Sequence, residues 1–135
     1  MNVSIDKILK NLREKVDSYE LPDGIQVIPE YPSIKSSKEE LYNSYSRSVV
    51  LYNSLCKTLS EMQFTIVTID KMLRKLASSD EVFTRQKYLN MELSNIKSDL
   101  KNTIESYYTI KGSMESSLRF FNSIQYLLNS PRLDT

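Results

Sequence analysis

The feature that most constrains the fold of this chain is a long stretch almost free of proline and glycine. Between Pro32 and Pro131 there is no proline and only one glycine, Gly112. Proline interrupts helices and glycine weakens them, so their scarcity allows long helices to run without a break. The stretch therefore predicts an all-α fold built from long helices.

Two heptad series, in which apolar side chains recur at alternating spacings of four and three residues, fill this stretch. The first runs from Leu41 to Leu76, and ten of its eleven positions are apolar or aromatic. The second runs from Val82 to Leu128, and eleven of its fourteen positions fit. Patterns sustained over so many heptads are typical of coiled coils rather than of the broader apolar stripe of a globular helix. We therefore expect two long helices that pack along narrow seams.

The two series are one residue out of phase, and the break falls within residues 77–81. An offset of one residue is neither the stutter of four nor the stammer of three found in continuous coiled coils. Ser78 and Glu81 also have capping-box spacing, which is typical of the start of a new helix. We predict a chain reversal near residues 77–81 and a helical hairpin. One continuous rod over residues 37–129 is the alternative, because the break lacks the glycine of a typical turn.

A shorter helix is expected before this region. Apolar residues at spacings of three and four predict a helix from about Ser4 to Glu20, which the sequence Leu21-Pro22-Asp23-Gly24 should end. Residues 25–34 contain two prolines and predict an extended connector. The chain is thus divided into an N-terminal helix and connector (1–34), a long helical hairpin (35–130) and a short tail (131–135).

The seams also predict where the chain meets partners. Two long arms with one seam each leave apolar surface to cover, and the chain has twenty serines, which are only middling helix formers. Packing must therefore hold the arms, and we expect a homo-oligomer or a subunit of a helical complex. The seam positions expected to carry these contacts are Leu41, Tyr45, Tyr52, Leu59, Ile66, Leu73, Leu93, Leu100, Tyr107, Met114 and Phe121.

Residue types that carry most enzyme chemistry are scarce. The chain has no His, one Cys and two glycines, so the commonest acid–base catalyst and metal ligand is missing. Neither a Cys-rich zinc site nor a Gly-rich phosphate loop can form. Cys56 has no His to activate it, and we interpret it as a packed structural residue. We expect no catalytic residues, no metal, no cofactor and no small-molecule substrate.

The sequence also bears on location. No apolar run approaches the length of a membrane-spanning helix, and the N-terminus lacks the apolar stretch of a signal peptide. A single Cys without an export signal is typical of a reducing compartment. We therefore expect a soluble intracellular protein with no membrane contact.

Charge is unevenly distributed although the formal net charge is only +1. Residues 1–34 carry a net charge of −2, whereas residues 71–87 carry +3. In a hairpin the basic residues of this second segment would converge near the tip, where they predict an anion site that repetition around an oligomer would strengthen. An ordinary solvated helix end is the alternative interpretation. The candidate nucleic-acid-binding residues are Lys71, Arg74, Lys75, Arg85 and Lys87.

The helical layout, together with two short stretches, resembles the UvsY-like recombination mediators of tailed phages. These stretches are Val49-Val50-Leu51-Tyr52 in the first long helix and Arg119-Phe120-Phe121 followed by Ile124 in the second. The chain departs from the family pattern in having no Trp and in being less basic. The resemblance implies an oligomeric protein that binds single-stranded DNA, helps to load a recombinase and displaces a single-strand-binding protein.

Two functional hypotheses follow from different classes of protein. The first is a non-catalytic helical assembly protein that makes coiled-coil contacts with itself or with partner subunits. The second is a UvsY-like mediator that binds single-stranded DNA. A small adaptor that docks one helix on a single target is a third alternative.

Overall fold

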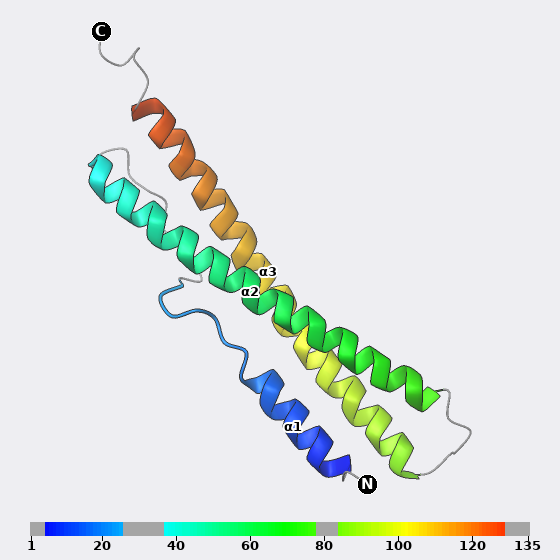
Figure 1. Cartoon of the computed structure of the whole chain (residues 1–135). Coiled ribbons are helices and arrows are strands. Elements are labelled where there is room, and N and C mark those ends of the chain that lie inside the picture. The colour runs from blue at the N-terminus through cyan, green and yellow to red at the C-terminus, as the bar shows by residue number, and fades with distance from the viewer. Residues whose placement is uncertain (1–4, 26–36, 78–83, 129–135) are drawn as a thin grey trace. The chain divides into compact units, whose positions relative to one another are not determined.

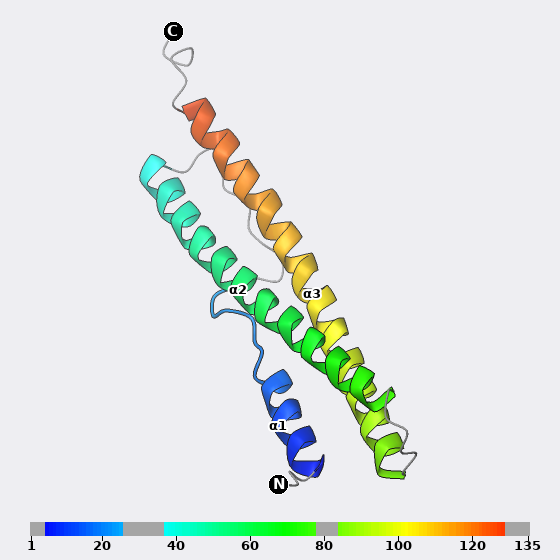
Figure 2. The same cartoon turned by 45° about the vertical axis from the view of Figure 1, so that its right-hand side comes forward.

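The computed structural model describes residues 5–25, 37–77 and 84–128, which form three α-helices (Figure 1). Helix α1 spans Ile5–Asp17, α2 spans Lys38–Ala77 and α3 spans Thr84–Leu128. Figure 2 shows that α2 and α3 each run as one uninterrupted helix. The described residues contain no strand, which confirms the predicted all-α fold class.

Helix α1 forms because its apolar residues share one face. Leu9, Leu12 and Val16 are buried at spacings of three and four residues. Asp6 in the first turn and Lys15 in the last turn oppose the partial charges at the two helix ends. The helix is three residues shorter at its C-terminal end than the predicted limit of Glu20.

A tight turn follows α1, as Leu21-Pro22-Asp23-Gly24 predicted. The Ile25 backbone N–H donates to the Pro22 carbonyl over 3.2 Å, and Gly24 has a φ of 88°. A positive φ at the third residue of such a turn is typical of type II geometry, in which glycine avoids a steric penalty.

Helix α2 begins with a cap at Ser37, just before its first residue. The Glu40 backbone N–H donates to the Ser37 hydroxyl over 3.1 Å, which satisfies one of the free donors of the first turn. The capping-box pair predicted at Ser78 and Glu81 lies outside the described residues.

Several hydroxyl groups are accommodated inside the long helices by bonds to the preceding turn. Thr65, Thr103, Ser106 and Ser123 each donate to the backbone carbonyl four residues earlier, at 3.1 to 3.2 Å. Such bonds satisfy the hydroxyl without a partner from another element.

The chain divides into two compact units, and the division cuts through both long helices. Unit 1 comprises Met1–Glu20 and Thr58–Ser106, and unit 2 comprises Leu21–Lys57 and Tyr107–Thr135. The first unit therefore contains α1 together with one part of α2 and one part of α3.

Unit 1 has a core to which all three helices contribute. Its buried apolar residues are Leu9, Leu12, Val16, Leu59, Met62, Ile66, Ile69, Leu93, Ile96, Leu100 and Ile104. Polar contacts at the edge of the core join the helices. Arg13 of α1 pairs with Asp99 of α3 at 2.8 Å, and Lys97 of α3 pairs with Asp70 of α2. Tyr19, just beyond α1, shares a 2.8 Å hydrogen bond with Thr65 of α2.

Unit 2 has a smaller core between its parts of α2 and α3. Leu41 of α2 is buried with Phe121 and Ile124 of α3, and Tyr45 packs against the same cluster. The rings of Tyr45 and Phe121 meet edge to face with their centroids 6.0 Å apart. Leu55, Ile110 and Met114 are also buried in this unit.

Several predicted features fall outside the described residues. These are most of the connector (25–34), the reversal after Ala77 and the tail (131–135). The predicted domain limits at residues 34 and 130 fall there too. Among the described residues, no helix has the length and apolar character needed to cross a membrane.

Candidate interaction surfaces

The eleven predicted seam residues all lie inward. Leu41, Leu59, Ile66, Leu93, Leu100, Met114 and Phe121 are buried, and Tyr45, Tyr52, Leu73 and Tyr107 are half-buried. The seven buried residues are covered by the chain itself, within one unit or the other.

A polar cluster lies at one seam position of unit 2. The Tyr52 hydroxyl donates to Glu115 Oε1 over 2.9 Å, and Lys111 Nζ pairs with the same oxygen at 3.2 Å. Lys111 also lies over the rings of Tyr52 and Tyr108, at 5.9 and 5.6 Å from their centroids. A cation in these positions is attracted to the negative faces of the rings.

The cluster shifts the titration of its three members in a consistent way. Hydrogen bonds from Tyr52 and Lys111 lower the pKa of Glu115, because they stabilise the carboxylate. The bond to Glu115 raises the pKa of the Tyr52 hydroxyl, with burial and the neighbouring Cys56 acting in the same direction. The bond to Glu115 also raises the pKa of Lys111. Tyr52 thus serves as a neutral donor and Lys111 as a cation.

The cluster joins α2 to α3 within unit 2. Its tyrosine donates the hydrogen bond to Glu115, and its lysine supplies the positive charge beside that carboxylate. Cys56 is half-buried beside the cluster and forms no disulfide. Within the described part of the chain, no group of three or more His, Cys, Asp or Glu residues could hold a metal ion.

A second feature is an outward face of α2 in unit 1, which we call the aromatic–basic face. It consists of Phe64, Val67, Lys71, Arg74 and Lys75, all exposed. At 3.6 residues per turn these side chains fall within a sector of about 100°. The carboxylates of this part of α2, on Glu61 and Asp70, lie outside that sector, and Asp70 is paired with Lys97.

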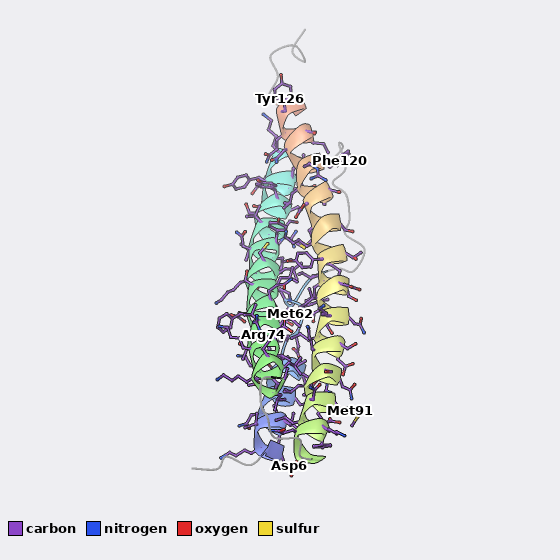
Figure 3. All side chains as sticks on the ribbon, turned by 90° about the vertical axis from the view of Figure 1, so that its right-hand side faces the viewer. Asp6, Met62, Arg74, Met91, Phe120 and Tyr126 are labelled. Carbon is purple, nitrogen blue, oxygen red and sulfur yellow. The ribbon has the colours of Figure 1, made fainter. Side chains whose placement is uncertain are left out.

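The structure describes four of the five residues of the predicted basic set. Lys71, Arg74 and Lys75 share the aromatic–basic face, and Figure 3 marks Arg74 on α2. Lys87 is exposed in the first turns of α3. Arg85 belongs to α3, but its side chain lies outside the described part of the structure.

The sequence interpretation missed Phe64, although a signal for it was present. Residues 60, 64, 67, 71 and 74 repeat the spacing of four and three on the side of α2 opposite the seam. The stronger seam pattern through Met62 and Ile66 masked this second series. Phe64 is 67% exposed, whereas Met62 faces the core of unit 1 (Figure 3).

Other large apolar side chains also face outward. On α3 of unit 1, Tyr88 and Met91 are exposed, and Figure 3 shows Met91 on the outer side of the helix. In unit 2 the exposed residues are Tyr42, Val50, Tyr108, Phe120 and Tyr126, and Figure 3 shows Tyr126 near the end of α3. Single exposed apolar side chains are normal on a surface, whereas large contiguous apolar patches mark surfaces that contact other molecules.

Comparison with known proteins adds no assignment to these surfaces. No protein-family model matches the chain, no curated protein matches it, and no solved structure matches it.

Proposed function

We propose that the chain is a non-catalytic helical assembly protein of a reducing intracellular compartment, which binds copies of itself or partner subunits through outward faces of α2 and α3. One observation carries this proposal. The described residues include nine large apolar or aromatic side chains that are 44 to 77% exposed, although the heptad seams are already covered. Isolated apolar residues are normal on a surface, but so many on two helices favour contacts with other molecules.

In this proposal α2 and α3 pair as an antiparallel, coiled-coil-like hairpin with a reversal near residues 77–81. Contacts within each unit support it. In unit 2, Leu41 packs with Phe121 and Ile124, and Tyr52, eleven residues later, bonds to Glu115, which comes before Phe121. In unit 1, Asp70 of α2 pairs with Lys97 of α3. Residues later in α2 thus meet residues earlier in α3, as an antiparallel pairing requires.

Sedimentation velocity of the full chain, combined with light scattering, tests the self-association part of this proposal. We expect a mass of at least two chains at micromolar concentration. A compact monomer throughout that range would exclude self-association. Partner subunits would then be sought by testing for altered sedimentation when candidate binding proteins are added.

The second candidate function is a UvsY-like mediator that binds single-stranded DNA, and the aromatic–basic face favours it. Lysine and arginine side chains neutralise phosphates, and an exposed phenylalanine offers a surface for base stacking. Phe64 lies about two helical turns before Lys71 and about three before Arg74 on the same face of α2. The sector contains three cationic residues and no carboxylate.

Fluorescence anisotropy with a labelled single-stranded oligonucleotide tests this candidate. We expect binding at about 50 mM salt that weakens as salt rises, because phosphate contacts release counterions. Arg74→Glu combined with Lys75→Glu should weaken binding, whereas Lys101→Glu, at an exposed lysine of α3, should have a smaller effect. No binding at low salt, or equal losses in all variants, would count against the aromatic–basic face as a DNA site.

A further inference from the structure

Two ion pairs in unit 1 lie on opposite sides of its core. Arg13 of α1 pairs with Asp99 of α3, and Lys97 of α3 pairs with Asp70 of α2. Asp99 and Lys97 are two residues apart on one helix, which places their side chains about 160° apart around its axis. Helix α1 therefore binds on the side of α3 that carries Asp99, and Lys97 meets Asp70 on the other side.

The side marked by Asp70 and Lys97 is rich in basic residues. Arg74 lies one helical turn after Asp70 on α2, and Lys101 lies one turn after Lys97 on α3. Arg74, Lys71 and Lys101 are exposed, and none of them forms an ion pair with another described residue. The cations of the aromatic–basic face therefore continue from α2 onto α3.

The carboxylates of α3 in unit 1 lie mostly away from these cations. Glu92 and Asp99 are seven residues apart and share the side of α3 that pairs with α1. Glu105 lies about two turns beyond Lys97. Asp70, by contrast, lies among the cations and holds Lys97 in an ion pair. A carboxylate in this position competes with a phosphate group for the same lysine.

We propose that single-stranded DNA binds across unit 1 from the aromatic–basic face to Lys97, and that Asp70 limits the affinity by competing with phosphate for that lysine. This inference rests on the second candidate function and specifies the extent of its site and the residue that restrains it. The side chains of Lys97 and Asp70 are 26% and 36% exposed, so a phosphate oxygen can approach the pair from solvent. Ion pairs open to solvent contribute little to stability, so phosphate can replace Asp70 at small cost.

Two substitutions of equal charge test the role of Asp70. Asp70→Asn and Asp99→Asn each remove one negative charge and release one basic residue from an ion pair, but on opposite sides of unit 1. At about 50 mM salt, Asp70→Asn should bind a labelled single-stranded oligonucleotide at least about threefold more tightly than wild type. Asp99→Asn should change binding much less, because salt screens a charge on the far side of the core.

The salt dependence gives a second measure of the same contact. In Asp70→Asn the slope of the logarithm of the binding constant against the logarithm of salt concentration should steepen by about 0.7, the contribution of one more phosphate contact to a single strand. Adding Lys97→Gln to Asp70→Asn should abolish the gain. Because the expected change is tighter binding, loss of structure cannot produce it, and circular dichroism confirms that each variant keeps its helix content.

The outcomes separate the inference from the function on which it rests. Equal gains in Asp70→Asn and Asp99→Asn, or a gain that persists without Lys97, would overturn the inference. Wild-type binding with no gain in Asp70→Asn would also overturn it, but would leave the second candidate function intact. No binding by any variant at about 50 mM salt would overturn both. Labelled polyglutamate is the remaining probe, and a gain for polyglutamate without one for the oligonucleotide would overturn DNA as the ligand.

Discussion

At the scale of single residues, the polar cluster of Tyr52, Lys111 and Glu115 in unit 2 is the feature of the structure that the sequence predicted least. Tyr52 was predicted as a seam residue, and it is half-buried as such a position requires. Its bond to Glu115 could not be predicted, because a heptad pattern specifies which side of a helix faces inward but not which residues meet across it. Lys111 and Glu115, four residues apart, carried only the weak signal of a local ion pair.

The cluster predicts an acid-sensitive contribution to stability. In the folded chain the pKa of Glu115 lies below its ordinary value of 4.5. Its stabilising effect is therefore present above that value and is lost as the pH falls through the folded pKa. Glu115→Gln should be less stable than wild type at pH 7, and the difference should shrink once the pH is below about 4.5.

Urea unfolding followed by circular dichroism over a pH series checks this prediction. Glu61→Gln, at an exposed carboxylate of unit 1, is the control and should follow the wild-type pH dependence more closely. A difference between Glu115→Gln and wild type that stays constant down to pH 3 would contradict the assigned role, since about pH 3 lies below the ordinary range of a glutamate.

At the scale of elements, local signals in the sequence predicted much of what is observed. The turn at Pro22–Ile25 and the end of α2 near residue 77 agree with the predictions. The division of α2 between Lys57 and Thr58 was not predicted. The heptad pattern continues evenly through that point, so no local signal marks a change of unit.

Gly112 offers a prediction at this scale, because it is a glycine inside a long helix. A Cβ added there would meet no atom within 4 Å, and the backbone φ is not positive. Gly112→Ala should stabilise the chain by about 0.5 to 1 kcal/mol, since alanine loses less backbone entropy on folding. Chemical unfolding measures the change.

Gly24→Ala is the matched control for that substitution. Gly24 also has open space around its Cα, but its φ of 88° is strained for any residue with a Cβ. This substitution should therefore destabilise the chain. Equal effects of the two alanine substitutions would show that backbone conformation does not decide them.

At the scale of the whole molecule, the N-terminal helix α1 packs against parts of α2 and α3 within unit 1. Which part it covers could not be predicted, because the apolar stripe of α1 does not specify which residues of α2 and α3 it packs against. Two polar contacts accompany this packing: Arg13 pairs with Asp99, and Tyr19 shares a hydrogen bond with Thr65. These contacts are 86 and 46 residues apart in sequence.

Helix α1 should therefore depend on its packing for its existence. It has only 13 residues, and an isolated helix of that length is marginal in water. Leu12→Asp would place a charge on the buried face, release α1 and expose its basic residues to trypsin, whereas Asn11→Asp, at the exposed neighbouring position, would not. We expect rapid cleavage after Lys10, Arg13 or Lys15 in Leu12→Asp alone, read by mass spectrometry. Cleavage at the wild-type rate in Leu12→Asp would mean that α1 stays helical without its packing against α2 and α3.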